Sequence, residues 1–224
     1  MYHNDIIESW KINASEWISA IEEQTIESRK VTNPAILKTI EDLNPSNILD
    51  LGCGEGWLTH KLNTLGIEAF GIDGTEQLIT KAKGRGNFYH LLSYEEIIEG
   101  APIPNAPYEA IVFNFCLYLK EGTQQILEAV KNYLKGRKLV VVQTLHPYTF
   151  ISSGVQYQNQ WLDNSWKGLK GNFRSPHKWY YRTLGGWSET IKSSGLSILD
   201  IKEPTSSDGK SPVSIIFTLT PNND

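Results

Sequence analysis

The segment ILDLGCGEG, residues 48–56, constrains the fold of this 224-residue chain more than any other feature. An apolar stretch typical of a buried strand ends there in a D-x-G-x-G-x-G turn, and the apolar spacing of the residues that follow predicts a helix. Glycines let a backbone turn sharply and approach a ligand closely, because no Cβ intervenes. A dinucleotide-binding loop has the spacing G-x-G-x-x-G, which seats a pyrophosphate on the helix N-terminus. Here position 57 is Trp, so the spacing disfavours a pyrophosphate.

A second acidic residue follows the next predicted strand. Asp73 lies at the end of that strand, within the segment Phe-Gly-Ile-Asp-Gly, as Asp50 lies near the end of the strand before it. In a doubly wound fold, a carboxylate at that position lies beside the first loop and accepts both hydroxyls of a ribose. A glycine loop without a phosphate site, next to a ribose-binding acid, predicts a nucleoside ligand that carries no phosphates.

The rest of the chain alternates between two hydrophobic periods. We expect strands over Asn47–Leu51, Ile67–Ile72, Asn87–His90, Glu109–Phe115, Lys138–Thr144, Leu196–Ile201 and Pro212–Thr220. We expect helices over Trp57–Leu65, Thr75–Lys83, Ser93–Glu99, Thr123–Leu134 and Gly186–Ser194. Strands that alternate with helices indicate an α/β fold, a parallel sheet covered by helices on both faces.

The N-terminal residues favour helices that precede this alternation. Residues 4–30 carry apolar side chains spaced three or four apart, which predicts an amphipathic helix, either continuous or broken near Asn13 and Ser15. A second helix is expected over Pro34–Leu43, with the proline in its first turn. Residues 1–45 are therefore expected to form a helical cover.

Aromatic side chains gather in residues 148–187, where prolines and glycines interrupt regular structure. We expect residues 147–185 to form an inserted lid rather than sheet. Its aromatic and basic side chains either wall a pocket for a flat or cationic molecule or form the lid's own small core. The residues concerned are Trp161, Trp166, Trp179, Tyr181 and Arg182. Arg182 has two further alternatives, a contact with an acidic ligand or a pair with Glu189.

Four segments resemble the class I S-adenosylmethionine-dependent methyltransferase family. They are ILDLGCGEGWLT, FGIDGTEQLI, YEAIVFNFCLYL and KLVVVQTLHP. The resemblance is good over residues 30–145 and looser towards the C-terminus, where residues 178–203 are loosely similar to methyltransferases of ubiquinone and menaquinone biosynthesis. It implies S-adenosylmethionine as the cofactor and a small molecule as the methyl acceptor.

The resemblance also implies roles for residues of the glycine loop. Asp50 would buttress the loop, and the backbone of Gly52, with Cys53 beside it, would contact the methionine part of the cofactor. Gly54 and Gly56 would keep space for the cofactor.

Further cofactor contacts are implied outside the loop. Asp73 would bind the ribose, Gly74 and Thr75 would flank the adenine, and Asn114 and Phe115 would lie near the methionyl end. Arg29 would pair with the cofactor carboxylate, unless it is a solvated surface residue. Where many members have an acid for the adenine amino group, this chain has Ser93, which either accepts that hydrogen bond or only caps the next helix.

His146 is the first candidate for a catalytic base. It follows the fifth predicted strand in Thr-Leu-His-Pro, at the edge of the sheet where open α/β folds bind ligands. The alternative is a structural histidine that holds the lid. Tyr118 is placed near the same edge, as an acceptor contact or as packing, and His177 in the lid is a weaker candidate for the base.

Composition and charge exclude several other classes. The formal net charge of −4 and the pI of 5.8 disfavour a general nucleic-acid binder. No apolar run approaches the roughly 18 residues that span a bilayer, and no secretion signal is recognised, so we expect a cytoplasmic protein with no membrane partner. The two cysteines and the histidines have neither disulfide nor zinc spacing, so no metal site is expected.

We therefore expect a single domain over residues 1–224. Its parts are a helical cover (1–45), a cofactor-binding core (46–146), an aromatic lid (147–185) and a C-terminal helix with two strands (186–224). The core is expected to be a doubly wound, Rossmann-like, seven-stranded sheet whose last strand is antiparallel. The expected function is methyl transfer to an oxygen or nitrogen of a small molecule. The alternatives are an inactive nucleoside-binding protein and a nicotinamide-dependent oxidoreductase.

Overall fold

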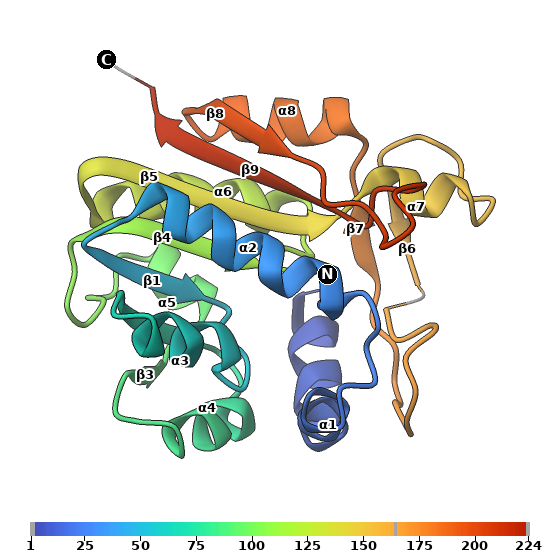
Figure 1. Cartoon of the computed structure of the whole chain (residues 1–224), viewed down its shortest axis with the longest axis horizontal. Coiled ribbons are helices and arrows are strands. Elements are labelled where there is room, and N and C mark those ends of the chain that lie inside the picture. Colours follow the sequence, from blue (N-terminus) through green and yellow to red (C-terminus); the bar gives the residue numbers. More distant parts are fainter. Residues whose placement is uncertain (1–2, 164, 223–224) are drawn as a thin grey trace.

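A computed structural model of the chain describes residues 3–163 and 165–222. A seven-stranded sheet forms its centre, in the order β3-β2-β1-β4-β5-β9-β8 (Figure 1). The strands are β1 (Asn47–Leu51), β2 (Glu68–Asp73), β3 (Tyr89–Leu91), β4 (Tyr108–Asn114), β5 (Leu134–Leu145), β8 (Leu196–Lys202) and β9 (Ser214–Pro221). The first five are parallel, and β9 runs antiparallel between β5 and β8. The expected doubly wound sheet with an antiparallel last strand is confirmed.

Helices cover both faces of the sheet, because its central strands have apolar side chains on both faces. In β4, Ile111 and Phe113 are buried on one face, and Ala110 and Val112 on the other. The first face packs against α5 (Tyr94–Ile98), α6 (Glu121–Ala129) and α8 (Leu184–Ser193). The second packs against α2 (Arg29–Leu43) and α3 (Trp57–Thr64), while α4 (Glu76–Lys83) lies along β2 and β3. Burial on both faces explains why the inner strands have nearly continuous apolar sequences.

The chain order of the strands reverses between β1 and β4. From β1 the chain proceeds outwards to β2 and β3, and from β4 it proceeds in the other direction to β5. Open α/β sheets bind ligands at the carboxyl ends of the strands at such a switch point. In Figure 1 the arrows of β1 and β5 point towards the side of the molecule where α1 (His3–Glu22) and the lid lie.

The N-terminal helices begin and end at other residues than expected. Helix α1 continues through Asn13 and Ser15, so of the two alternatives the break there is wrong, and the helix is interrupted only at residues 23–28. The side chain of Asn13 donates to the Ser9 carbonyl within the helix at 2.7 Å and does not disrupt the backbone. Helix α2 begins at Arg29 and contains Pro34, which the helix accommodates at the loss of one backbone hydrogen bond.

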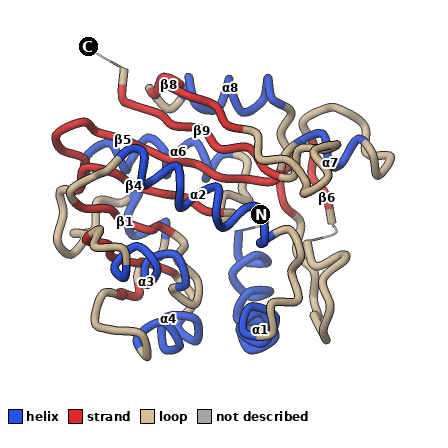
Figure 2. Tube along the Cα trace, in the orientation of Figure 1, coloured by secondary structure: helices blue, strands red, loops and turns tan. Residues whose placement is uncertain are grey.

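The lid contains regular structure that the sequence did not indicate. After the short helix α7 (Pro147–Ile151), an antiparallel ribbon pairs β6 (Gln160–Leu162) with β7 (Trp179–Tyr181), so the expectation of a lid without sheet is wrong. Trp161 and Tyr180 lie opposite each other in this ribbon, with ring centroids 5.2 Å apart. Such cross-strand aromatic pairs stabilise short ribbons. Figure 2 shows that the chain between β6 and β7 is mostly loop.

The connection from α6 to β5 also differs from the expected one. Helix α6 ends at Ala129, and a 3-10 turn over Val130–Tyr133 leads directly into β5 at Leu134. The strand therefore begins four residues before Lys138, the expected start, because Leu134 pairs with Tyr108 ahead of a register shift.

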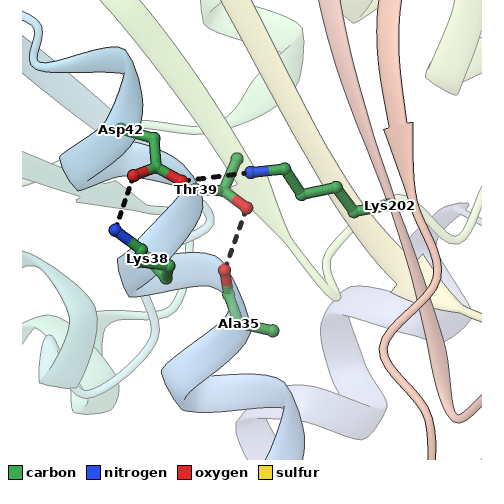
Figure 3. A network of polar contacts seen from close by, with 5 residues as sticks. All are labelled: Ala35, Lys38, Thr39, Asp42 and Lys202. Carbon is green, nitrogen blue, oxygen red and sulfur yellow. Dashed lines mark hydrogen bonds and ion pairs between the residues drawn. The ribbon is translucent and has the colours of Figure 1, made fainter.

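Helix α2 is attached to the sheet by both apolar and polar contacts. Asp42 accepts from Lys38 at 2.7 Å and from Lys202, at the end of β8, at 3.5 Å (Figure 3). Exposed ion pairs contribute at most about 1 kcal/mol each. The attachment therefore depends mainly on Ile36 and Ile40, whose side chains are fully buried.

Polar side chains on one face of α1 bond to the lid. Asn13 donates to the carbonyl of Arg174 at 2.7 Å and accepts from its amide at 2.8 Å. Ser9, one turn earlier, donates to the carbonyl of Ser175 at 2.6 Å and accepts from the indole of Trp166 at 3.0 Å. Because residues four apart lie on the same helix face, this pattern fixes how α1 rests on the lid.

We predict that Asn13→Ala loosens the lid without disturbing the sheet. The variant loses both hydrogen bonds to Arg174 in a buried setting, which costs about 1–3 kcal/mol. Hydrogen exchange should become at least about tenfold faster in residues 165–177 and stay unchanged in β1 and β4. Lys11→Ala, on the exposed face of α1, is the control. Unchanged exchange in the lid would contradict this role of Asn13.

Candidate active site

A cavity of about 650 Å³ opens at the switch point, between the glycine loop, α1, the segment after β4 and the lid. Most residues expected from the sequence line it. They are Arg29, Asp50, Gly52, Cys53, Gly54, Asp73, Gly74, Thr75, Ser93, Asn114, Phe115, Tyr118, Trp166, Trp179, Tyr181 and Arg182. The fold thus brings together side chains from segments far apart in the sequence. Three expected residues, Gly56, His146 and Trp161, are not part of the lining.

The three glycines of the loop serve different purposes. Gly52 has φ +78°, and a Cβ there would lie 2.6 Å from the Cβ of Cys116, so only glycine fits. Gly54 has φ +59° and faces open space, since a Cβ there would approach only Trp17, at 3.9 Å. A Cβ on Gly56 would lie 2.6 Å from the ring of Tyr89. The expectation that Gly56 keeps space for a ligand is therefore wrong; it gives room to a core side chain.

Asp50 is 1% exposed and supports the loop from below. Its carboxylate accepts from the hydroxyl of Thr59, on α3, at 2.8 Å, which joins β1 to the helix after the loop. Burial raises the pKa of Asp50 to about 7, and the negative charges of Glu55 and Asp73 act in the same direction.

Asp73 joins the end of β2 to the glycine loop. One carboxylate oxygen accepts from the amide of Gly54 at 3.0 Å, and the other accepts from the amide of Thr75 at 2.8 Å. Burial raises its pKa, and these two hydrogen bonds oppose that rise. A carboxylate oxygen has two lone pairs, so each oxygen keeps the capacity to accept a hydroxyl from the cavity.

Ser93 caps α5. Its hydroxyl accepts from the amide of Glu96 and donates to the Glu96 carboxylate at 2.8 Å, while its own amide donates to the same carboxylate. The capping box expected from the sequence is confirmed. Because the hydroxyl hydrogen is engaged by Glu96, Ser93 offers the cavity only a lone pair. The adenine contact stays a prediction.

Two groups of opposite charge line the cavity with unused hydrogen-bonding capacity. The guanidinium of Arg29 lies 4.8 Å above the ring of Trp57 and, within residues 3–163 and 165–222, makes no hydrogen bond or ion pair. Burial lowers its pKa. One oxygen of Glu55 accepts from the indole of Trp17 at 3.0 Å, and the other is buried without a partner in the described part of the chain. Together they suit a ligand that carries both a carboxylate and an ammonium group.

His146 does not have the geometry of a base. Its Nδ1 accepts from the amide of Tyr148 at 3.1 Å, so its hydrogen lies on Nε2, which is 2.7 Å from the Glu203 carboxylate. Both nitrogens are therefore engaged, and the ring, 5% exposed, lies outside the cavity lining. The expectation of a catalytic base at this position is wrong; His146 caps α7 and holds the start of the lid.

Aromatic rings from α1 and the lid form one wall of the cavity. The ring of Trp10 lies 4.9 Å from Trp166 and 6.1 Å from Tyr118, centroid to centroid. The ring of His177 lies 5.5 Å from Tyr118 and 5.3 Å from Trp166. The two alternatives for the lid aromatics are therefore both partly correct, because these rings pack on each other and line the cavity. Trp161 packs on Tyr180 instead.

Arg182 is bonded mainly to backbone carbonyls. Its Nη2 donates to the carbonyls of Leu119 and Lys120, both at 2.7 Å, and its Nε donates to Thr190 at 3.1 Å. The alternative of a pair with Glu189 is therefore wrong. Burial lowers the pKa of Arg182 to about 10. The remaining Nη1 is buried and has no partner among the described residues, so a contact with a ligand stays a prediction.

The lining residues that the sequence did not indicate include Trp10, Trp17 and Glu55. Trp10 and Trp17 are seven positions apart and so share a face of α1, but helical periodicity does not tell what that face covers. Glu55 lies inside the glycine loop, and this position could have indicated that its carboxylate lines the cavity.

Two general findings complete the description. In residues 3–163 and 165–222, no group of three or more His, Cys, Asp or Glu side chains is arranged to hold a metal ion. Over the same residues, no helix is long and apolar enough to cross a membrane.

A family model described as a methyltransferase domain matches residues 26–199. Among similar proteins is a ubiquinone biosynthesis O-methyltransferase of Paraburkholderia phytofirmans, 33% identical over 140 residues, 56% of this chain and 58% of that protein. An uncharacterised protein of Haemophilus influenzae is 22% identical over 201 residues, 80% of this chain and 78% of that protein.

Solved structures share the fold. An S-adenosylmethionine-dependent methyltransferase from Clostridium acetobutylicum superposes with a TM-score of 0.68 at 16% identity and covers 94% of this chain and 100% of its own. A 1,6-didemethyltoxoflavin-N1-methyltransferase of Burkholderia thailandensis, solved with 1,6-didemethyltoxoflavin and S-adenosylhomocysteine, has a TM-score of 0.65 at 13% identity. It covers 94% of this chain and 87% of its own.

We predict that Asp50→Asn changes how stability depends on pH. The folded state holds the Asp50 proton up to about pH 7, whereas the unfolded chain releases it near pH 4, so stability is lost as pH rises through this window. Urea unfolding at pH 5.0, 5.75 and 6.5 should show the wild type losing roughly 1.4 kcal/mol per pH unit relative to the variant. The exposed Asp200→Asn should show no such trend. Parallel curves for wild type and Asp50→Asn would contradict the raised pKa.

Proposed function

The chain belongs to the methyltransferase domain family, whose members take the methyl group from S-adenosylmethionine, and we propose that it transfers this group to an oxygen or nitrogen of a small molecule. The acceptor binds in the cavity beneath α1 and the lid. The observation that carries the proposal is the cavity itself, because groups suited to a phosphate-free nucleoside line one wall and aromatic rings line another.

The residues present fit the methyl donor. S-adenosylmethionine has a ribose, an amino-acid end and no phosphate. Asp73 would accept from the ribose hydroxyls, and Gly54 leaves open space beside it. Arg29 and Glu55 would take the carboxylate and the ammonium of the amino-acid end. When bound, the donor supplies a methyl group that its sulfonium has already activated.

The chain's own contribution is to position the acceptor and exclude water. The cavity volume of about 650 Å³ lies within the range of small-molecule sites. Rings of Trp10, Tyr118 and Trp166 hold a bound molecule in a fixed orientation and keep it dry. Fixed orientation alone contributes several kcal/mol to the lowering of a reaction barrier.

The named relatives support a small-molecule acceptor. One is an O-methyltransferase of ubiquinone biosynthesis, and one structural neighbour is an N1-methyltransferase solved with a small heterocyclic molecule. Since one relative methylates oxygen and another nitrogen, the proposal includes both elements.

We predict that Asp73→Asn weakens binding of S-adenosylhomocysteine by roughly tenfold to a hundredfold, because one ribose hydroxyl loses its acceptor and meets an amide hydrogen instead. Isothermal titration measures this, with thermal unfolding as the check on folding. Glu76→Gln, an exposed acid three positions away, should bind within about twofold of wild type. A folded wild-type chain that does not bind S-adenosylhomocysteine would sink the proposed function.

We predict that Arg29→Met weakens binding of ligands that carry the amino-acid end of the donor and leaves binding of the nucleoside end unchanged. Methionine keeps the apolar contact with Trp57 but removes the positive charge. Binding of S-adenosylhomocysteine should weaken by about tenfold, as expected for a charged hydrogen bond. Binding of methylthioadenosine, which lacks the amino-acid end, should stay the same. Equal weakening of both ligands would show that Arg29 does not contact the carboxylate.

A further inference from the structure

His177 is a buried lid residue whose ring has no hydrogen-bond partner in the part of the chain that the structure describes. The ring is 3% exposed and lines the cavity, yet neither Nδ1 nor Nε2 is bonded within residues 3–163 and 165–222. Its backbone amide is fixed by the hydroxyl of Ser165 at 3.0 Å. The rings of Tyr118 and Trp166 make T-shaped contacts with the imidazole and restrict its orientation. The fold thus fixes this imidazole firmly while it leaves both nitrogens unused.

An unused polar group in the interior has a cost. A buried nitrogen without a partner destabilises a protein by about 1–3 kcal/mol, so native structures rarely keep one without a reason. Burial lowers the pKa of His177 to about 4, with no charged neighbour among the causes of the shift. At neutral pH the ring is therefore uncharged and offers one acceptor and one donor nitrogen.

Other polar groups on the cavity wall are less suited to accept a proton. The hydroxyl of Tyr118 donates to the carbonyl of Phe115. Asn114 presents a buried Oδ1 without a partner in the described part, but an amide oxygen is too weak a base to take a proton. One oxygen of Glu55 accepts from Trp17, and the other, which has no partner in the described part of the chain, is the one proposed to bind the ammonium group of the methyl donor.

We propose that His177 is a catalytic residue that accepts the proton of a hydroxyl group on a flat, aromatic acceptor. The inference rests on the proposed function and narrows its oxygen or nitrogen to the oxygen of a phenol or enol. The aromatic wall formed by Trp10, Tyr118 and Trp166 favours a flat molecule.

The charge state of the acceptor decides between a hydroxyl and an aliphatic amine. An aliphatic amine arrives as an ammonium ion, which a weakly basic imidazole cannot deprotonate. A phenol arrives uncharged. Its oxygen becomes strongly acidic only as the new bond forms, so a weak base placed next to it is sufficient.

Methyl transfer forms one bond and breaks one. A lone pair of the acceptor oxygen forms a bond to the methyl carbon, while the carbon–sulfur bond breaks and its electron pair stays on sulfur. The hydroxyl proton passes to the free nitrogen of His177 and then to solvent. The products are a methyl ether, S-adenosylhomocysteine and one proton.

The test uses three molecules of nearly equal shape, p-cresol, p-xylene and p-toluidine, with the complex of the protein and S-adenosylhomocysteine. Titrations followed by NMR give the affinities, and the imidazole nitrogen signals of ¹⁵N-labelled histidine report on His177. His177→Phe keeps the ring contacts with Tyr118 and Trp166 and removes the nitrogens. His60→Gln, on α3 away from the cavity, is the control.

The wild type should bind p-cresol more tightly than p-xylene, and only p-cresol should shift the His177 signals. In His177→Phe this preference should fall about three- to tenfold, as expected for one neutral hydrogen bond, while p-xylene affinity changes little. The control should keep the wild-type preference.

Three results would overturn the inference. They are binding of none of the probes, a p-cresol preference that persists in His177→Phe, or the same dependence on His177 for p-toluidine, which would assign nitrogen. In each case, binding of S-adenosylhomocysteine in the same sample leaves the proposed function standing. Absence of that binding would remove both proposals.

Discussion

Two carboxylates at the ends of neighbouring strands hold the glycine loop in place, and the rest of the site depends on them. Asp50 ties β1 to α3 through Thr59, and Asp73 ties β2 to the loop through the amides of Gly54 and Thr75. Asp50 is buried and Asp73 is half-buried, so their hydrogen bonds are shielded from water and stronger than at an exposed surface. The loop is thereby shaped before any ligand arrives, and the cavity is largely preorganised.

The fold was predictable where the signal was local. The glycine loop at residues 48–56 and the strands on either side of it follow from short-range spacing and periodicity, and they were located to within one residue. The lid ribbon was not predictable in this way. Strands β6 and β7 have only three residues each and lie far apart in the sequence, so no periodicity could reveal them. Their stability comes from cross-strand aromatic contacts and from the elements beneath them.

The site was predictable to the extent that its residues act through their position on strands. His146 follows a strand, as a catalytic base at this edge of the sheet would, but Glu203 and the amide of Tyr148 bond to its two ring nitrogens in the folded chain. His177 lies in an irregular segment without a local signal, and it is distinguished only because its ring nitrogens have no hydrogen-bond partner among the described residues. A helix break near Asn13 stayed an alternative because the hydrogen-bond partner of its side chain, Arg174, is 161 residues away and cannot be identified from the sequence. Long-range hydrogen bonds of this kind leave no trace in a single sequence.

Helix α1 contacts both halves of the cavity, and this has a thermodynamic consequence. Trp17 bonds to Glu55 on the glycine loop, while Asn13, one turn earlier, and Ser9, two turns earlier, bond to the lid. Because the same helix contacts the glycine loop and the lid, a ligand that orders one of them through α1 also favours the ordered state of the other. Such coupling is reciprocal. A molecule that tightens the glycine loop therefore raises affinity at the aromatic wall by the same factor that a molecule on the aromatic wall raises affinity at the loop.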